Sequence, residues 1–456
     1  MKQIGKSRKA FVEKMGTVTI NMEEYEHAGA DTDVLKMVID KIEDLPPLPL
    51  IVHKILNVTQ DENSDTGELA KVISNDQALT AKVLRIVNSP LYHVSTLVTS
   101  ISHAVTLLGF RAIRNLSMGL STIETFGQSE ENPFLPRQRF WEHSLACAHC
   151  CKAIADRIRH RFPDEAFVGG LLHDIGRMVF DQFFPGSFTV ALQEAYASRK
   201  PLLELETEEI GISHTLVGKL LLQKWNLPPS LADAVANHHN PSLKEGADPS
   251  RADVSLIIMV ADILTKIACI GSGGDSYVHI PGHEIWKSIG LEEGDYLPIL
   301  FNLSEQVEEI KGFFGIKEVS SSSQPSPRIG EEGKPPRLAF YWENNGESPV
   351  PVRLMLQRFF TVKSFPIDDD IRGSIEGFSP HILFVDLSFE KSTQGISEAV
   401  KAYRSATKGP VVFLLSKKIS QETRERSAKI GIYFLSTPFS PQEVSDCLCQ
   451  VDLNNQ

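Results

Sequence analysis

Histidine and aspartate residues in five places along the middle of the chain are the residues best suited to chemistry. Each place lies in or beside a run of apolar residues, as GGLLHDIGRMVF shows for the adjacent pair at its centre. The set comprises His143, His173, Asp174, His214, His238, His239 and Asp262. Imidazole nitrogens and carboxylate oxygens are ligands that divalent Fe, Mn, Ni and Zn accept. Helical side chains of these types can converge in a bundle core, which predicts a divalent transition-metal site.

Asp262 and His143 show why these side chains are expected to point inward. Asp262 lies in LIIMVADILTKIA, an almost wholly apolar helix, where a carboxylate is costly unless it is paired, protonated or bound to a cation. His143 shares a helical stripe with Cys147 and Ile154. Two interpretations stay open at this point: a metal centre, or a hydrogen-bonded polar core that needs no metal.

The elements that must position these residues are helices. Residues 31 to about 126 carry apolar residues at steps of three and four and form a predicted helical bundle, and a second helical block runs from about 140 to 315. The segment VSSSSQPSPRIGEEGKPP has no periodicity and is predicted to be a flexible linker. Beyond it, RLAFYW, HILFVDLS, PVVFLLS and IYFLS alternate with helix-length segments, which predicts a parallel sheet with helices on both faces.

These patterns divide the chain into five parts and predict a multidomain protein, with an all-α module followed by an α/β domain. The predicted parts are an N-terminal tail (1–30), an N-terminal helical part (31–128), a second helical domain (129–315), the linker (316–336) and a C-terminal α/β domain (337–456). The length of 456 residues agrees with several domains rather than one core.

Composition restricts the compartment and the partners. Hydrophobic residues make up 42% of the chain and charged residues 23%, which is typical of a globular protein, and no apolar stretch is long enough to predict a leader or a membrane span. The six cysteines indicate no disulfide framework, so we expect a reducing cytoplasm. A net charge of -12 favours neither nucleic acid nor a membrane as a partner.

The order of the motifs, His, then His-Asp, then His, then His-His, then Asp, resembles the HD superfamily of metal-dependent phosphohydrolases. The wider sequence, with LPPLP, SNDQALTAKVLRIVNSP, WEHSLA, GLLHDIG and EIGISHTLVGKLLLQKWNLP in this order, closely resembles the HDOD (HD-related output domain) family over about residues 31–290. The resemblance implies a helical HDOD module, with an HD-like domain at 129–315, in a bacterial signalling protein. Members of this family are generally regarded as regulatory, with catalysis undemonstrated for most of them.

The resemblance also implies roles for single residues. It assigns one metal to His143, His173, Asp174 and Asp262, and a second metal or a substrate phosphate to His214, His238 and His239. Arg177 follows the HDIG motif where relatives that hydrolyse cyclic-di-GMP usually carry lysine, and no Gly-Tyr-Pro signature follows the His-His pair. Specific hydrolysis of cyclic-di-GMP is therefore not expected.

Residues 337 to about 452 resemble a response-regulator receiver domain, which has a flavodoxin-like fold. The resemblance places Asp386, in HILFVDLS, at the position of the phosphoacceptor aspartate. Three positions depart from the pattern: Thr437 replaces lysine, Glu343 stands alone where an acidic pair is usual, and Leu415 replaces a hydroxyl residue. We therefore expect a degenerate receiver that serves docking or dimerisation.

The combined interpretation is a cytoplasmic bacterial signalling protein that acts by protein-protein or ligand-dependent interaction rather than by catalysis. Its expected partners are other signalling proteins and a phosphorylated small molecule bound in the HD pocket, and a divalent transition metal is the one cofactor considered. The alternative is a metal-dependent phosphohydrolase or phosphodiesterase in which His173 and Asp174 are the catalytic residues.

Overall fold

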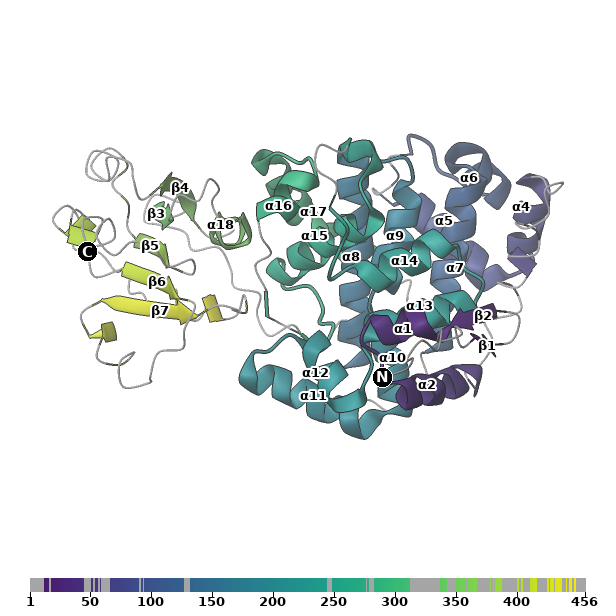
Figure 1. Ribbon diagram of the computed structural model, residues 1–456. Coiled ribbons are helices and arrows are strands. Elements are labelled where there is room, and N and C mark those ends of the chain that lie inside the picture. Colours follow the sequence, from purple (N-terminus) through teal and green to yellow (C-terminus); the bar gives the residue numbers. More distant parts are fainter. Residues whose placement is uncertain are drawn as a thin grey trace, which may run out of the picture.

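The protein is described from a computed structural model of the full chain. The structure describes residues 12–15, 18–44, 66–89, 94–126, 132–243, 248–275 and 283–311, the short pieces 51, 54–55, 58, 92 and 277–278, and the strands, one helix and shorter pieces of the C-terminal region. The LPPLP motif and the predicted linker at 316–336 lie outside the described residues. Figure 1 shows a large helical body with a smaller sheet region beside it.

The N-terminal segment contains regular structure where the sequence predicted only a tail. Strands β1 (Val12–Met15) and β2 (Val18–Asn21) pair antiparallel, and helices α1 (Met22–His27) and α2 (Thr32–Asp44) follow. Tyr25 on α1 is buried, and its hydroxyl donates to Gln223 Oε1 at 2.9 Å. The prediction of a tail over residues 1–30 is therefore wrong for this part, because the segment packs against residues 198 positions away in the sequence.

Among the described residues, four helices follow one another in the N-terminal bundle of the helical module. They are α4 (Thr66–Ser74), α5 (Gln77–Val87), α6 (Ile101–Leu108) and α7 (Phe110–Thr125). Two of them begin at a side-chain cap: Asp76 accepts from the Leu79 amide at α5, and Ser100 accepts from the His103 amide at α6. The predicted helical bundle is confirmed for these residues.

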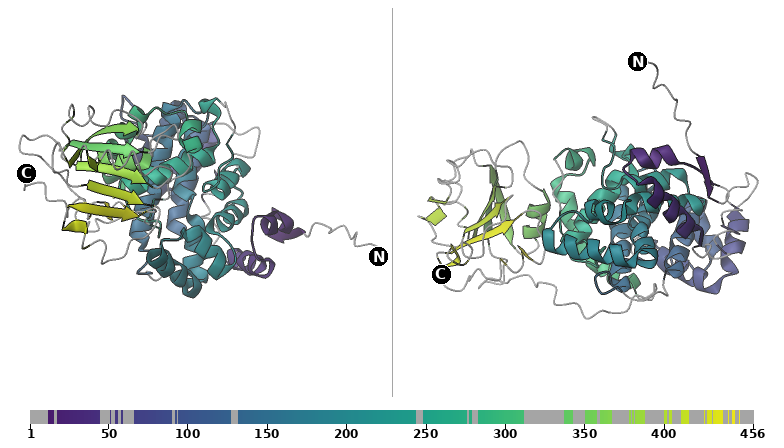
Figure 2. Two further views of the ribbon diagram at one scale, coloured as in Figure 1. Left: turned by 60° about the vertical axis from the view of Figure 1, so that its left-hand side comes forward. Right: turned by 60° about the horizontal axis from the view of Figure 1, so that its bottom comes forward.

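The second helical block is built around α8 (Arg137–Arg157), which runs through the middle of the body (Figure 1 and Figure 2). Its other helices are α9 (Pro163–Leu172), α10 (Ile175–Phe183), α11 (Pro185–Ser198), α12 (Leu202–Ile210), α13 (His214–Lys224), α14 (Pro229–Asn237), α15 (Val254–Ile267), α16 (His283–Ser288) and α17 (Glu293–Lys311), with a 3-10 turn at Pro249–Arg251. Helix α8 packs against α9, α15 and α17. Of the helices in the described residues, none combines the length and the apolarity that crossing a membrane needs.

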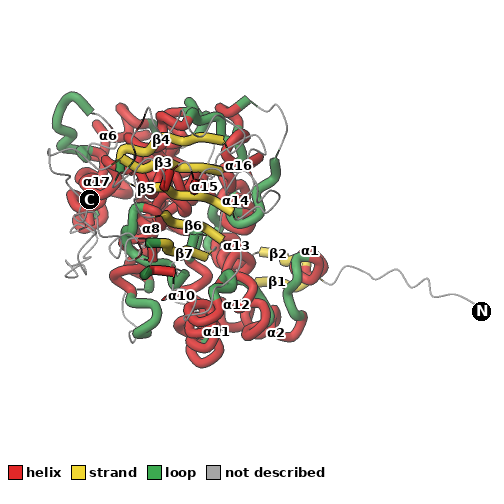
Figure 3. Tube along the Cα trace, turned by 90° about the vertical axis from the view of Figure 1, so that its left-hand side faces the viewer, coloured by secondary structure: helices red, strands yellow, loops and turns green. Residues whose placement is uncertain are grey.

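The C-terminal region contains a five-stranded parallel sheet (Figure 3). Its strands are β3 (Arg337–Trp342), β4 (Thr361–Pro366), β5 (Ile382–Leu387), β6 (Val411–Leu415) and β7 (Ile432–Ser436). They lie in the order β4, β3, β5, β6, β7, and every neighbouring pair is parallel. Helix α18 (Val350–Gln357) lies between β3 and β4 in the chain. The predicted parallel sheet is confirmed.

Helix α15 links the helical body to the sheet region, and most of its residues are buried. It packs on α8, α9 and α14 of the body and also on α18 of the sheet region. Helix α17 contacts α18 as well. At a second point, the Arg199 guanidinium after α11 forms an ion pair with Glu443. The sheet region is thus docked on the helix that carries Asp262.

Candidate metal centre

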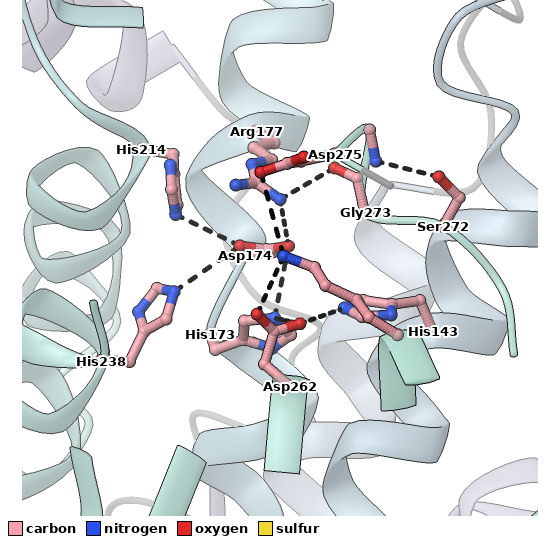
Figure 4. A network of polar contacts seen from close by, with 12 residues as sticks. His143, His173, Asp174, Arg177, His214, His238, Asp262, Ser272, Gly273 and Asp275 are labelled. Carbon is pink, nitrogen blue, oxygen red and sulfur yellow. Dashed lines mark hydrogen bonds and ion pairs between the residues drawn. The ribbon is translucent and has the colours of Figure 1, made fainter. Parts of the chain in front are cut away.

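Five segments of the second helical block converge on one site. Figure 4 shows most of the side chains that they contribute. Helix α8 supplies His143, the turn between α9 and α10 supplies His173 and Asp174, α13 begins at His214, the turn after α14 supplies His238 and His239, and α15 supplies Asp262. Six of these side chains are buried, and His239 is partly exposed. The structure therefore brings all seven predicted residues together, and their binding of a metal stays a prediction.

The seven side chains form two groups, and in each group one ligand atom per residue lies within 4.8 Å of all the others. The three-ligand group is His143, His173 and Asp262, and the four-ligand group is Asp174, His214, His238 and His239. The resemblance implied that Asp174 shares a metal with the first group. Its Oδ1 atom instead lies 3.2 Å from His214 Nε2 and 3.8 Å from His238 Nε2. Its Oδ2 atom lies 3.3 Å from His173 Nε2, so Asp174 stands between the two groups.

Three of the imidazoles are held in one orientation through their Nδ1 atoms. In His173 and His238, Nδ1 lies 2.8 Å and 2.7 Å from the carbonyl oxygen three residues earlier. In His214, Nδ1 lies 2.5 Å from Glu206 Oε2. Because these oxygens only accept, Nδ1 carries the proton and Nε2 keeps a lone pair directed at the site. Histidines that bind metals are generally oriented by a hydrogen bond of this kind.

The atoms that face the centre of the site have no hydrogen-bond partners. They are Nε2 of His143, His173, His214, His238 and His239, and Oδ1 of Asp174 and Asp262. His143 Nε2 lies 3.0 Å from Asp262 Oδ1, but the contact lacks hydrogen-bond geometry. Buried polar atoms without partners are rare and costly. So many of them on imidazoles and carboxylates fit a divalent metal ion, which accepts these donors.

Two cations hold the other oxygens of the two aspartates. Arg177 donates from Nη1 to Asp174 Oδ2 and from Nε, at 3.2 Å, to Glu206 Oε1. Lys266 Nζ lies 3.1 Å from Asp262 Oδ2. Each aspartate thus has Oδ2 beside a cation and Oδ1 beside imidazoles, and Oδ2 of Asp174 also faces His173.

The surroundings keep the two aspartates and His238 in the states that bind metal, whereas the Asp174 carboxylate, acting against burial, raises the pKa of His173 well above its usual range. Burial alone would raise the pKa of Asp174, but the Arg177 guanidinium holds this pKa well below its usual range. Burial acts on Asp262 in the same way, and the Lys266 ammonium holds the pKa of this carboxyl well below its usual range. Burial lowers the pKa of His238 well below that of an exposed imidazole. Carboxylates and neutral imidazoles are the protonation states in which these side chains are metal ligands.

A glycine-rich loop, residues 271–275, closes one side of the site. A Cβ atom at Gly273 would lie 2.5 Å from Asp174 Oδ2 and 2.9 Å from Arg177 Nη1. The Gly273 carbonyl oxygen accepts from Arg177 Nη1 at 2.9 Å, and Asp275 Oδ2 lies 3.9 Å from Lys266 Nζ. The loop backbone therefore touches the site itself, which a residue with a side chain at position 273 would prevent.

Three residues of the site were not predicted from the sequence. Glu206 shares the buried stripe of α12 with Ile210, and a carboxylate on a buried stripe is the signal that could have found it. Lys266 lies one helical turn after Asp262, which is the spacing of a helical ion pair. Asp275 offered no signal, because a position in a loop does not predict what the side chain faces.

Together, the fold and the site define a helical module with a buried His-Asp pair between two helices and further ligand-type residues around it. Residues 45–241 match the model of the HDOD domain. The chain therefore contains an HDOD domain, as its motifs predicted. An uncharacterized protein of Treponema pallidum is 25% identical over 236 residues, which are 51% of this chain and 45% of that relative. The chain thus spans less than half the length of this curated relative.

Solved structures of similar proteins include two that are covered over nearly their whole length. An HDOD domain protein of unknown function from Geobacter sulfurreducens is 26% identical, covers 65% of this chain and 98% of its own, and superposes with a TM-score of 0.48. A Shewanella amazonensis protein that is provisionally named a phosphohydrolase is 24% identical, covers 61% of this chain and 97% of its own, and superposes with a TM-score of 0.46.

Proposed function

We propose that this chain is a signal-transduction protein whose HDOD module binds a divalent metal and acts by interaction with partners rather than by catalysis. The observation that carries the proposal is the position of α15. This helix presents Asp262 and Lys266 to the site, and it packs both on α14, which leads to His238, and on α18 of the sheet region. A change of charge or packing at the site therefore acts on the helix against which the C-terminal region is docked.

The proposed partners are other signalling proteins, and the proposed ligand is a phosphorylated small molecule. The Arg177 and Lys266 cations beside the ligand groups support an anionic ligand. When bound, a divalent metal would attract phosphate oxygens and lower the pKa of a coordinated water. The proposed compartment is the bacterial cytoplasm, and the free thiols of the five described cysteines support it.

Hydrolysis of a phosphoester is the second candidate function. The complete set of seven ligand-type residues favours it, with His173 and Asp174 as the catalytic residues. Two features favour the regulatory function instead. Arg177 already holds one oxygen of Asp174, and six of the seven ligand side chains are buried, two of them, His143 and Asp174, against the loop at 271–275.

For the C-terminal region we propose a degenerate receiver-like domain with a flavodoxin-like fold that serves docking. Numbered within the region, the strand order is 2-1-3-4-5, which is the order of flavodoxin-like sheets. Asp386 lies on the central strand β5, one residue before that strand ends at Leu387. Glu343 and Thr437, two of the positions that depart from the receiver pattern, lie outside the described residues.

Incubation with acetyl phosphate and Mg²⁺ should leave the mass of the protein unchanged. Glu343 stands alone where receivers carry an acidic pair after the first strand, and Thr437 replaces the lysine, so the set of charges that would hold magnesium and the phosphoryl group is incomplete. Intact-protein mass spectrometry measures this directly, with Asp386→Ala as the matched control. A phosphoryl adduct on the parent that disappears in the Asp386→Ala protein would show an active receiver.

Removal of metal should speed amide hydrogen exchange in α15 and, through it, in α18. Loss of the ion removes a positive charge from the site that Asp262 and Lys266 of α15 face, which should destabilise α15. Because α15 contacts α18, the effect should extend to α18. The measurement compares exchange in the metal-loaded and the chelator-treated full-length protein. Peptides from α4, at the far end of the helical body in Figure 1, serve as the internal control. Exchange in α18 that does not respond to metal would contradict the proposed coupling.

A further inference from the structure

The charged side chains around the seven ligands suit one divalent ion better than two. Among the described residues, the carboxylates that face the site or its cations are Asp174, Glu206, Asp262 and Asp275, and the cations are Arg177 and Lys266. With all five imidazoles neutral, which is the state in which imidazoles bind metal, these groups leave a net charge of about minus two. One divalent ion neutralises this charge. Two divalent ions would leave the opposite charge in a buried site, which is costly.

The same two cations occupy two carboxylate oxygens that could otherwise bind a second ion. Asp174 Oδ2 is the atom of this carboxylate that faces the three-ligand group, 3.3 Å from His173 Nε2, and Arg177 already donates to it. Lys266 lies beside Oδ2 of Asp262, the carboxylate of the three-ligand group. The three-ligand group therefore keeps only Oδ1 of Asp262 and two imidazoles clear of these cations.

The four-ligand group has no such restriction. It offers one carboxylate oxygen and three imidazole nitrogens within 4.8 Å of one another, and these atoms would supply four ligands to a divalent ion. The Nδ1 contacts of His214 and His238 also fix two of its imidazoles in the orientation that binding requires.

We propose that the site holds one divalent cation, in the four-ligand group, and that Arg177 and Lys266 take the place of a second. Both are positioning residues, because they hold the aspartates and set the number of ions without being ligands. This inference rests on the proposed function in one respect: the module must bind a divalent metal at all.

The test counts Mn²⁺ in the full-length protein. The protein is stripped with a chelator and equilibrated with excess Mn²⁺, and the unbound ion is removed by gel filtration. Elemental analysis then gives the bound Mn²⁺ per chain, and electron paramagnetic resonance distinguishes an isolated ion from a coupled pair. The parent is expected to hold about one equivalent with the signal of an isolated ion.

Variants of Arg177 and Lys266 test whether these two cations limit the number of bound ions to one. Lys266→Met should raise the count to about two equivalents and give the signal of a coupled pair, because it frees Asp262 Oδ2 and removes a positive charge. Arg177→Met should do the same, whereas Arg177→Lys, which keeps the charge, should stay near one. Lys152→Met is the matched control. Lys152 is also buried and paired with two aspartates, Asp156 and Asp164, but these aspartates belong to neither ligand group. Its count should equal that of the parent.

Two ligand variants locate the ion. His214→Ala should lose the bound Mn²⁺, and His143→Ala should keep it. Three results would overturn the inference and leave the proposed function standing. The first is two equivalents of Mn²⁺ in the parent, and the second is loss of the ion in a folded His143→Ala protein. The third is a count that stays at one in the Lys266→Met or Arg177→Met variants that circular dichroism shows to be folded. Absence of bound Mn²⁺ from the parent would overturn the proposed function itself.

Discussion

Replacement of Asp174 by alanine is expected to abolish metal binding and to lower the free energy of unfolding of the helical module by about 3 kcal/mol. Asp174 is the carboxylate of the four-ligand group, and its Oδ2 accepts from Arg177. Without Asp174, the Arg177 guanidinium, which is 1% exposed, keeps one ion-pair partner, Glu206. Glu206 also contacts the His214 imidazole. A buried charge that loses its partner is strongly destabilising, because water does not replace the lost contact.

Asp181→Ala separates the two effects of this substitution. Asp181 and Arg137 form another buried ion pair, with Nη2 and Oδ2 2.7 Å apart, and neither residue is a candidate ligand. Urea unfolding followed by far-ultraviolet circular dichroism should therefore show a comparable loss of stability in Asp181→Ala, whereas elemental analysis should show the parent's metal content. Full metal content in Asp174→Ala would contradict the assignment of this residue as a ligand.

Replacement of Gly176 by alanine is expected to lower the free energy of unfolding by about 3 kcal/mol, the upper end of the usual cost of overpacking. A Cβ atom at this position would lie 2.0 Å from the His214 carbonyl oxygen and 2.9 Å from the His214 Cα atom. These are backbone atoms at the start of α13, so no side-chain rotation relieves the clash. The helices must move apart, which also separates His214 from Asp174, 3.2 Å away across the contact.

Gly186→Ala is the control for the intrinsic effect of a glycine-to-alanine change. Gly186 lies in α11, and a Cβ atom there would meet nothing within 4 Å. This variant should be neutral or more stable by up to about 1 kcal/mol, because alanine favours the helix. Thermal unfolding of both variants, with bound metal measured alongside, gives the comparison. Equal stability of Gly176→Ala and the parent would show that α10 and α13 do not meet as closely as described.

Several features of the fold followed from the sequence. Apolar residues at steps of three and four predicted the helices of residues 66–126, and the alternation of short β-rich runs with longer segments predicted the parallel sheet. The N-terminal segment was predicted wrongly, because β1, β2 and α1 are short and their position depends on contacts such as that of Tyr25 with Gln223. A short element carries little periodic signal of its own.

The sequence by itself determined which residues meet at the site. A histidine or an aspartate on an apolar helical stripe is expected to point inward, which identified His143 and Asp262, and the apolar context and order of the other motifs identified the remaining five residues. The helical periodicity also placed all seven within one helical block of the chain.

Only the tertiary structure decided how these residues divide into two groups and which cations accompany them. The two oxygens of Asp174 face different groups because α10 meets the start of α13 at Gly176, and no spacing along the chain encodes that contact. The positions of Glu206 and Asp275 likewise depend on how distant segments pack around Arg177 and Lys266. Residue types and their periodicity fix which side chains are buried, but the distances between helices fix which of them share an ion.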